Sequence, residues 1–194
     1  MAQNRAGVTP GMKVLDCAAG TGVMAEAAMR LGVKAADILC SDVSPEMLEV
    51  AKKKLSVRTL VASADSLPLK DEQFDFVTMG YALRHVESLE STFAEYFRVL
   101  RSGGRVLILE ITVPENRFAR ACFRLYFRDI YPALTRIFTG SRAACDMMRY
   151  YWETMEAVVP PESILELLRS TGFAEVRRNV VGGVFSEYTA RKAG

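Results

Sequence analysis

The chain alternates short apolar runs, many of them β-branched, with segments of helical periodicity, and this alternation constrains the fold more than any other feature. Such alternation is typical of βαβ units, in which helices connect parallel strands of one sheet. The apolar runs are continuous, which indicates strands covered on both faces. Five strands are predicted, at residues 13–17, 37–42, 58–62, 74–79 and 105–111. The expected fold class is therefore α/β, a doubly wound sheet.

Helical signals fill most of the gaps between these strands. Residues 21–31 and 89–101 carry apolar side chains at helical spacing, and the second segment ends at a pair of glycines. Ser44 and Pro45 supply an N-cap and a first-turn proline for another helix. A last helix is predicted at residues 161–170.

The C-terminal residues read as a β-hairpin. Apolar strand patterns at residues 173–181 and 184–191 flank Gly182-Gly183, a signal for a two-residue turn. The sheet should therefore end in an antiparallel pair.

No strand pattern is found between residues 112 and 160. This segment is rich in Arg, Phe, Tyr and Met, and its pattern predicts helices. An insertion at the carboxyl end of a strand in a doubly wound sheet lies beside the ligand crevice. The insertion is therefore a candidate substrate cover, although a helical pair that only shields one edge of the sheet explains it equally well. The chain length fits one domain over residues 1–194, insertion included.

Composition and charge exclude several classes of protein. Twenty-five Lys and Arg against 23 Asp and Glu leave a net charge of +2, too balanced for a protein that coats nucleic acid. The four cysteines form no C-x-x-C pair and the single histidine cannot complete a zinc site, so we expect reduced thiols and no metal. No signal peptide and no run approaching the roughly 20 apolar residues of a membrane span is visible, which favours a cytoplasmic protein.

Residues 14–22, V-L-D-C-A-A-G-T-G, place a strand, a turn of small residues and a helix start in succession. Small residues let the backbone approach a ligand, and a helix N-terminus offers N–H groups to an anionic end. Asp42 follows Gly22 by twenty residues at the end of the second strand, where a carboxylate can accept from both ribose hydroxyls. The pattern alone also satisfies the loose dinucleotide fingerprint.

Two further carboxylates help to distinguish a dinucleotide from a nucleoside ligand that carries an ammonium group. Asp16 would repel a pyrophosphate but attract the ammonium group of S-adenosylmethionine, although it could instead cap the following turn. Asp65 follows the third strand and could accept from an adenine amino group, although an Asx-turn before Pro68 is the alternative.

The order of motifs resembles that of class I S-adenosylmethionine-dependent methyltransferases, and more narrowly the ubiquinone/menaquinone biosynthesis C-methyltransferase (UbiE-like) family. The motifs that carry the resemblance are V-L-D-x-A-x-G-T-G, S-D-V-S-P-E-M-L, A-D-S-L-P-L, F-D-F-V, A-L-R-H-V, F-R-V-L-R-S-G-G, L-I-L-E and R-Y-Y-W-E-T. The likeness implies a Rossmann-like sheet of seven strands in the order 3-2-1-4-5-7-6 with the last strand antiparallel.

The resemblance also implies which residues contact the cofactor. Asp16, Gly20, Thr21 and Gly22 are expected to contact the methionine part of the cofactor. The ribose and the adenine are expected to contact Asp42, Val43, Ala64 and Asp65, and Gly80 is a further contact.

The sequence departs from the family pattern in three places. Only thirteen residues precede Val14, fewer than in the family, so the lid that closes the family's site is missing or supplied otherwise. The family's G-L-R-N is A-L-R-H here, which puts the exact substrate in doubt, and its K-P-G-G is R-S-G-G.

Candidate catalytic residues follow the fourth strand and lie in the insertion. His85 is the only histidine, the residue type that most often serves as a general base, and it is a candidate base or substrate contact, or else a surface or helix-capping residue. Arg84 could stabilise a developing phenolate, or form an ordinary surface salt bridge. Tyr150 is a further catalytic candidate, and weaker ones are Asp146, Glu153 and Glu110.

Arginines at 117, 120, 124 and 128 share one face of a predicted helix, backed by Phe123, Tyr126, Phe127, Ile130 and Leu134. Such a helix could lie on an anionic membrane surface, where a prenylated quinol is found, or present a solvated face over core aromatics.

The predicted function is transfer of a methyl group from S-adenosyl-L-methionine to a small aromatic or quinol acceptor, most simply at carbon, with S-adenosyl-L-homocysteine as product. The expected partners are this small molecule, a peripheral membrane contact and a second copy in a homodimer, with no nucleic acid. The alternatives are an O- or N-methyltransferase for another small molecule, and a non-catalytic binding subunit of the same fold.

Overall fold

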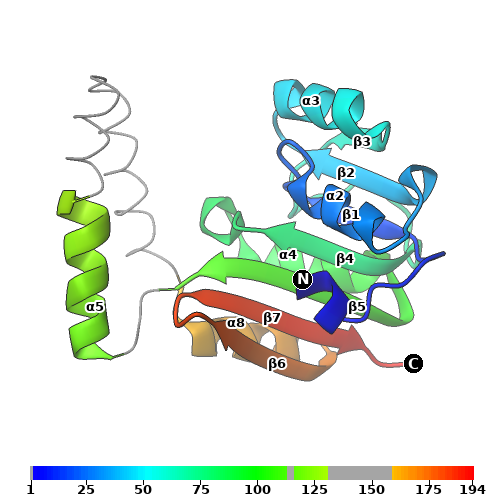
Figure 1. Ribbon diagram of the computed structural model, residues 1–194. Coiled ribbons are helices and arrows are strands. Elements are labelled where there is room, and N and C mark those ends of the chain that lie inside the picture. The colour runs from blue at the N-terminus through cyan, green and yellow to red at the C-terminus, as the bar shows by residue number, and fades with distance from the viewer. Residues whose placement is uncertain (1, 113–115, 131–158) are drawn as a thin grey trace.

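The computed structural model describes residues 2–112, 116–130 and 159–194, which form one seven-stranded sheet with helices on both faces and a helix that stands apart (Figure 1). The strand order is β3-β2-β1-β4-β5-β7-β6, as expected, and β7 runs antiparallel to both of its neighbours. The strands are β1 (Val14–Cys17), β2 (Ile38–Asp42), β3 (Arg58–Val61), β4 (Phe74–Gly80), β5 (Leu100–Ile111), β6 (Phe173–Val181) and β7 (Phe185–Lys192).

The helices form two layers around this sheet. One face packs against α1 (Ala2–Arg5), α2 (Val23–Arg30) and α3 (Pro45–Leu55), and the other against α4 (Leu89–Val99) and α8 (Pro161–Ser170). Two short 3-10 helices, η1 (Ala35–Asp37) and η2 (Leu83–His85), precede β2 and follow β4. Beyond β5 come α5 (Arg117–Arg124) and the π-helix η3 (Leu125–Ile130).

The N-terminus of α3 shows how local sequence sets these boundaries. The Ser44 hydroxyl accepts a hydrogen bond from the Met47 N–H at 3.2 Å, and Pro45 occupies the first helical position. A side-chain acceptor satisfies one of the N–H groups that a helix start leaves unpaired, and proline has no N–H to satisfy. The predicted start of this helix is therefore confirmed.

Two predicted boundaries were wrong. The helix expected at residues 89–101 ends at Val99, because Leu100 already pairs with Phe74 as the first residue of β5 and is fully buried. The two glycines expected to end the helix therefore lie within a strand. The hairpin turn is longer than predicted, since Val181 pairs with Phe185 and leaves Val184 in the loop with both glycines.

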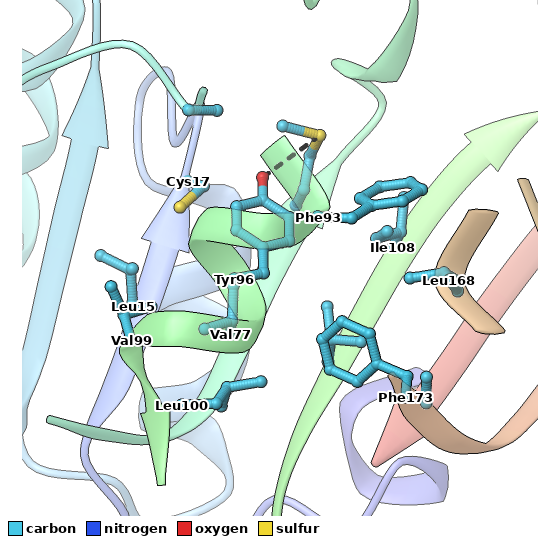
Figure 2. Packing of buried hydrophobic residues seen from close by; sticks show 14 of the residues in the cluster. Leu15, Cys17, Val77, Phe93, Tyr96, Val99, Leu100, Ile108, Leu168 and Phe173 are labelled. Atoms are coloured by element: carbon cyan, nitrogen blue, oxygen red, sulfur yellow. Dashed lines mark hydrogen bonds between the residues drawn. The ribbon is translucent and has the colours of Figure 1, made fainter. Parts of the chain in front are cut away.

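The core between the sheet and α4 is built from aromatic and aliphatic side chains (Figure 2). Phe93 and Tyr96 of α4 are fully buried against Val77 and Ile108 of the sheet. The Tyr96 hydroxyl donates to the Met79 sulfur at 3.7 Å. This packing fixes α4 against the strands whose carboxyl ends form the site.

The described cysteines are free thiols. Cys17 and Cys40 are buried, and burial raises the pKa of Cys17 to about 12, whereas Cys122 is exposed on α5. Cys145 lies outside the described residues. Within the ranges described, no group of His, Cys, Asp and Glu side chains could hold a metal ion. Nor is any helix there long and apolar enough to cross a bilayer.

The arginine stripe of the insertion is only partly as expected. Arg117, Arg120 and Arg124 lie on α5, but the α-helix ends at Arg124 and residues 125–130 are wound as a π-helix. Because π-helical hydrogen bonds span five residues rather than four, the predicted α-helix does not continue over residues 125–130. Of the apolar residues expected behind this stripe, Phe123 is half-buried, Tyr126 and Ile130 are 45% and 41% exposed, and Leu134 lies outside the described residues.

Candidate functional site

The loop between β1 and α2 has a backbone that favours small residues. Ala18, Gly20 and Gly22 have φ angles of 50°, 53° and 81°, in the left-handed region that side chains disfavour. The Ala19 N–H donates to the Ser41 carbonyl at 3.0 Å, which ties the loop to β2. Ala18 carries a Cβ in this conformation, where the general class has glycine, so this position is strained.

The glycines of the site have different spatial roles. A Cβ on Gly22 would come within 2.7 Å of the Leu55 side chain, so this glycine allows α2 to approach α3. A Cβ on Gly20 would meet no atom within 4 Å, so the space above Gly20 is open to a ligand. At the end of β4, a Cβ on Gly80 would lie 2.8 Å from the Met24 side chain, which brings β4 close to the start of α2.

Asp16 lies fully buried beneath this loop. Its Oδ2 accepts a hydrogen bond from the Ala25 N–H at 3.0 Å, so Asp16 does stabilise the start of α2, as one of the two interpretations of the sequence expected. Its Oδ1 is buried and has no hydrogen-bond partner among the described residues. Burial raises the pKa of Asp16 to about 8, against the opposing effect of the Ala25 hydrogen bond. A ligand with a cationic donor would satisfy both the free oxygen and the charge.

Asp42 connects the end of β2 to the same loop. Its Oδ2 accepts from the Gly20 N–H at 2.8 Å and its Oδ1 from the Ser44 N–H at 2.9 Å. An ionised carboxylate can accept about four hydrogen bonds, so both oxygens keep capacity for hydroxyl donors. Val43, next in the chain, has a side chain that is 68% exposed.

The β3–β4 loop, residues 62–73, carries the third carboxylate. Asp65 is half-buried and lies with the buried Ala64 in a turn closed by a hydrogen bond from the Ser66 N–H to the Ser63 carbonyl at 3.3 Å. Asp16, Asp42 and Asp65 thus follow one another at the carboxyl ends of β1, β2 and β3.

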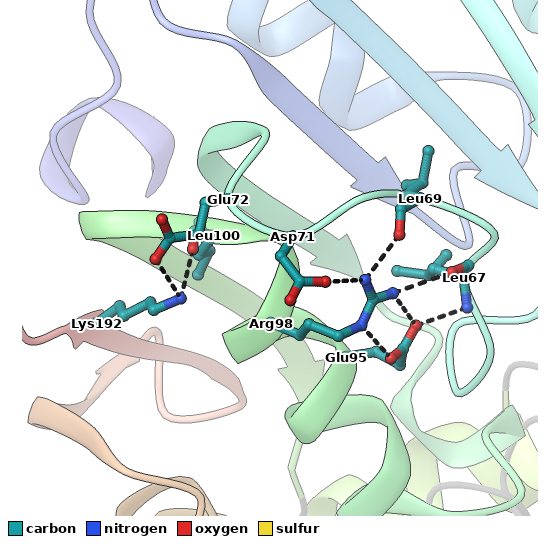
Figure 3. A network of polar contacts seen from close by, with 8 residues as sticks. All are labelled: Leu67, Leu69, Asp71, Glu72, Glu95, Arg98, Leu100 and Lys192. Atoms are coloured by element: carbon teal, nitrogen blue, oxygen red, sulfur yellow. Dashed lines mark hydrogen bonds and ion pairs between the residues drawn. The ribbon is translucent and has the colours of Figure 1, made fainter.

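A network centred on Arg98 of α4 holds the β3–β4 loop (Figure 3). The Arg98 guanidinium donates to the carbonyls of Leu69 and Leu67 at 2.7 and 3.0 Å, and to Asp71 at 2.7 Å. It also pairs with Glu95, which accepts from the Leu67 N–H at 2.8 Å. The sequence analysis missed Arg98, although the spacing of Glu95 and Arg98 on one helix face indicated an ion pair.

Arg84 and Glu110 form a buried ion pair after β4 and at the end of β5. Arg84 Nη1 lies 2.9 Å from Glu110 Oε1, and the two side chains are 9% and 0% exposed. Burial raises the pKa of Glu110, partly offset by its hydrogen bonds and by Arg84. The pair is therefore not the ordinary surface salt bridge that was one of the two interpretations of Arg84.

Of the other catalytic candidates, His85 is the one that lies in the described part of the chain. The His85 side chain is exposed on η2. Tyr150, Asp146 and Glu153 lie outside the described residues. Within the described chain, Arg84 and Glu110 are thus the candidates that share a buried position near Gly80.

Two pockets border the loop that follows β4. A pocket of about 340 Å³ lies on the α2 side of the sheet, with Met24, Tyr81 and Phe185 in its lining. A pocket of about 540 Å³ lies on the other side, between η2, α4 and α8, with Arg84 in its lining. The site therefore combines a polar cradle at three strand ends with space for a second ligand.

The arrangement suits a ligand with an ammonium group, a ribose and an adenine better than a dinucleotide. The buried, unpartnered oxygen of Asp16 calls for a hydrogen-bond donor. A pyrophosphate at the same place would have no donor for that oxygen, and the ionised form of Asp16 would repel it. The residues present thus fit S-adenosylmethionine.

Sequence comparisons give the family. The model of the ubiE/COQ5 methyltransferase family matches residues 1–192. The chain is 31% identical over 195 residues to the ubiquinone/menaquinone biosynthesis C-methyltransferase UbiE of Teredinibacter turnerae, covering 96% of this chain and 77% of that protein. It is 34% identical over 179 residues to the demethylmenaquinone methyltransferase of Clavibacter sepedonicus, covering 90% and 71%.

Comparisons with solved structures agree on the fold. A SAM-dependent methyltransferase from Aquifex aeolicus matches 97% of this chain and 86% of its own, with a TM-score of 0.69 and 19% identity. The phosphoethanolamine N-methyltransferase 2 of Haemonchus contortus, in complex with S-adenosyl-L-methionine, matches 100% of this chain and 51% of its own, with a TM-score of 0.71 and 18% identity. From the family match over nearly its whole length and the cradle at its strand ends, the chain belongs to the ubiE/COQ5 methyltransferase family and is an S-adenosylmethionine-dependent methyltransferase.

Proposed function

We propose that the protein methylates a ring carbon of a quinol in the biosynthesis of ubiquinone or menaquinone. The observation that carries this proposal is the similarity to quinone C-methyltransferases over 90–96% of the chain. The geometry is compatible with that chemistry, because an apolar pocket borders Met24 directly after the cradle loop, and the buried pair of Arg84 and Glu110 lies where β4 and β5 end.

The cofactor roles are assigned from position. Asp16 and the Gly20–Gly22 turn hold the methionine part, with Thr21 between the glycines. Asp42 and Val43 contact the ribose side, and Ala64 and Asp65 contact the adenine. Gly80 keeps the end of β4 free of a side chain near Met24. These assignments rest on the strand ends at which each residue lies and on the free oxygen of Asp16.

The reaction requires the protein to align the acceptor with the methyl group, to exclude water and to provide a proton acceptor. The bound cofactor supplies an activated methyl group, which forms a bond to the ring carbon while the carbon–sulfur bond breaks and its electron pair stays on sulfur. The ring then loses a proton from the same carbon. Arg84, held by Glu110, is the candidate for stabilising negative charge on the neighbouring ring oxygen, and His85 is the candidate proton acceptor.

The insertion after β5 is proposed to cover the acceptor and to contact the membrane. α5 carries three arginines beside an exposed Phe118 and half-exposed Tyr126, a composition that suits the interface of an anionic bilayer. In this proposal one domain, residues 1–194, contains both the cradle and its cover. A homodimer is also proposed, and the mass of the protein in solution tests it.

A methylation assay with matched acceptors tests the function. The purified protein is incubated with S-adenosylmethionine and either a 1,4-naphthoquinol unsubstituted at carbon 2 or a 2-methoxy-1,4-benzoquinol. We expect a product heavier by one CH₂ whose proton NMR spectrum shows a methyl group on a ring carbon. A methoxy signal would identify an O-methyltransferase instead, and no transfer to any quinol would contradict the proposal.

A further inference from the structure

We propose that the acceptor ring binds in the apolar pocket between α2 and the β6–β7 hairpin, with Tyr81 and Phe185 as its aromatic walls. This inference rests on the proposed function and names the place where its substrate sits. The pocket has a volume of about 340 Å³, and its lining also includes Met24 and Leu109.

The pocket adjoins the cofactor cradle. Met24 is the second residue of α2, directly after the cradle loop, and its side chain packs against Gly80 so closely that a Cβ there would lie 2.8 Å away. Tyr81 follows Gly80 in the chain. A ring in this pocket would therefore lie next to the part of the cradle assigned to the methionine portion of the cofactor.

The backbone of Tyr81 is strained in a way that local sequence does not explain. Its φ angle is 59°, a left-handed conformation that a bulky residue rarely adopts. The Tyr81 N–H donates to the Leu109 carbonyl at 2.8 Å, and the ring meets Phe185 edge-on at a centroid distance of 6.4 Å. Strain of this kind persists where surrounding contacts hold it, and it is common at ligand sites. Here it places an aromatic side chain at the pocket instead of continuing β4.

The size and polarity of the pocket suit a hydroxylated aromatic ring. A cavity of about 150 Å³ admits benzene, so about 340 Å³ accommodates a substituted ring or two fused rings. Gln3 lies in the wall, where its Nε2 donates to the Met24 carbonyl at 3.0 Å. Its Oε1 is buried and accepts no hydrogen bond from the described residues. A ring hydroxyl would supply the missing donor.

The pocket on the opposite face is less suited to this acceptor. Glu87, Glu90 and Glu166 line it beside Arg84, whose charge is already paired with Glu110, so a ring oxygen that becomes negative there would meet an excess of carboxylates. In the α2-side pocket the lining carboxylate is Glu187, which is paired with Arg5.

Three tryptophan substitutions test the location. Ala27→Trp fills the α2-side pocket from the second turn of α2, Ser163→Trp fills the opposite pocket, and Ala94→Trp places the same side chain on the exposed side of α4. We expect Ala27→Trp to raise KM for the quinol by about tenfold or more while the other two variants stay near the wild type. All three should keep the wild-type thermal shift with S-adenosylhomocysteine. A large effect of Ser163→Trp with none of Ala27→Trp would overturn the assignment.

A binding measurement separates this inference from the proposed function. In the presence of S-adenosylhomocysteine, 1,4-naphthoquinone is titrated into the wild type, Ala27→Trp, Phe185→Leu and Tyr81→Phe, and binding is followed by thermal shift. Phe185→Leu should weaken binding and Tyr81→Phe should retain it, because the aromatic wall remains. Loss of binding in Ala27→Trp would support the pocket even if no quinol is methylated. Unchanged binding in Ala27→Trp and Phe185→Leu would overturn it even if quinols are methylated.

Discussion

At the scale of the residue, the protonation state of Asp16 affects both the stability of the fold and the binding of the cationic cofactor. Burial raises its pKa from 3.8 to about 8, so the folded protein holds the proton more tightly than the unfolded chain. This contribution to stability is complete below pH 3.8 and is lost as the pH rises through about 8. A bound cation would favour the ionised form, so cofactor binding at neutral pH should release a proton.

Asp16→Asn tests this titration. The amide oxygen can still accept from the Ala25 N–H, but it no longer ionises, so the variant should lose the decline in unfolding free energy between about pH 5 and pH 8.5. Urea unfolding at the two pH values measures the difference, and calorimetry should show loss of S-adenosylhomocysteine binding. The same pH dependence in both proteins would contradict the prediction.

His85 is a second prediction at this scale. If it accepts a proton from the ring, His85→Ala should lower turnover by about tenfold or more, because general base catalysis contributes on that order, while the affinity for S-adenosylhomocysteine stays unchanged. Steady-state kinetics and calorimetry measure the two quantities. Its exposed position makes the outcome informative, since unchanged turnover would remove His85 from the mechanism and leave Arg84 as the catalytic candidate among the described residues.

At the scale of the element, α4 positions the β3–β4 loop through one side chain. Arg98 binds two loop carbonyls, and its ion pairs with Glu95 and Asp71 raise its own pKa, so it stays charged under all ordinary conditions. Arg98→Met keeps the aliphatic stem and removes every donor.

We expect Arg98→Met to weaken cofactor binding through the adenine-side loop. The matched control is Arg191→Met, which removes an exposed arginine paired with Glu175 on the β6–β7 hairpin. KM for S-adenosylmethionine should rise severalfold in the first variant and stay constant in the second, with kcat little changed in both. An equal effect of the two substitutions would indicate a general loss of stability instead.

The α5 helix presents a different prediction, because its three arginines, Arg117, Arg120 and Arg124, are exposed. Binding to vesicles of anionic phospholipid should be detectable by co-sedimentation at low salt and should weaken as salt screens the charges. The double substitution Arg117→Glu and Arg124→Glu should abolish it. Lys52→Glu with Lys53→Glu makes the same charge change on exposed positions of α3 and should leave binding intact. No sedimentation of the wild type at low salt would end the membrane proposal.

At the scale of the whole molecule, cofactor binding should stabilise the fold as a unit, because the cradle joins β1, β2 and the loop after β3. At about 100 times its dissociation constant, S-adenosylhomocysteine should add roughly 2.7 kcal/mol to the unfolding free energy. For a chain of this length that corresponds to a Tm increase of about 5–10 °C. NAD should cause no shift, and scanning fluorimetry compares the two ligands directly. A shift with NAD alone would contradict the assignment of Asp16.

Much of this architecture could be predicted because its signals are local. The apolar runs located the strands to within a few residues, and Ser44-Pro45 located the start of α3. Where a tertiary contact competes with a local signal, the prediction failed: pairing of Leu100 with Phe74 ended α4 before the glycines that appeared to cap it.

The sequence by itself determined the alternation of strands and helices, the small residues of the cradle and the carboxylates at three strand ends, because each depends on residues a few positions apart. Only the tertiary structure decided which distant groups meet. The pairing of Arg84 with Glu110, 26 residues away, and the left-handed backbone of Tyr81 beside Phe185 depend on strand register and on the packing of the hairpin. Such contacts leave no periodic signal in a single sequence, since their energy comes from burial and geometry that exist only after the sheet has formed.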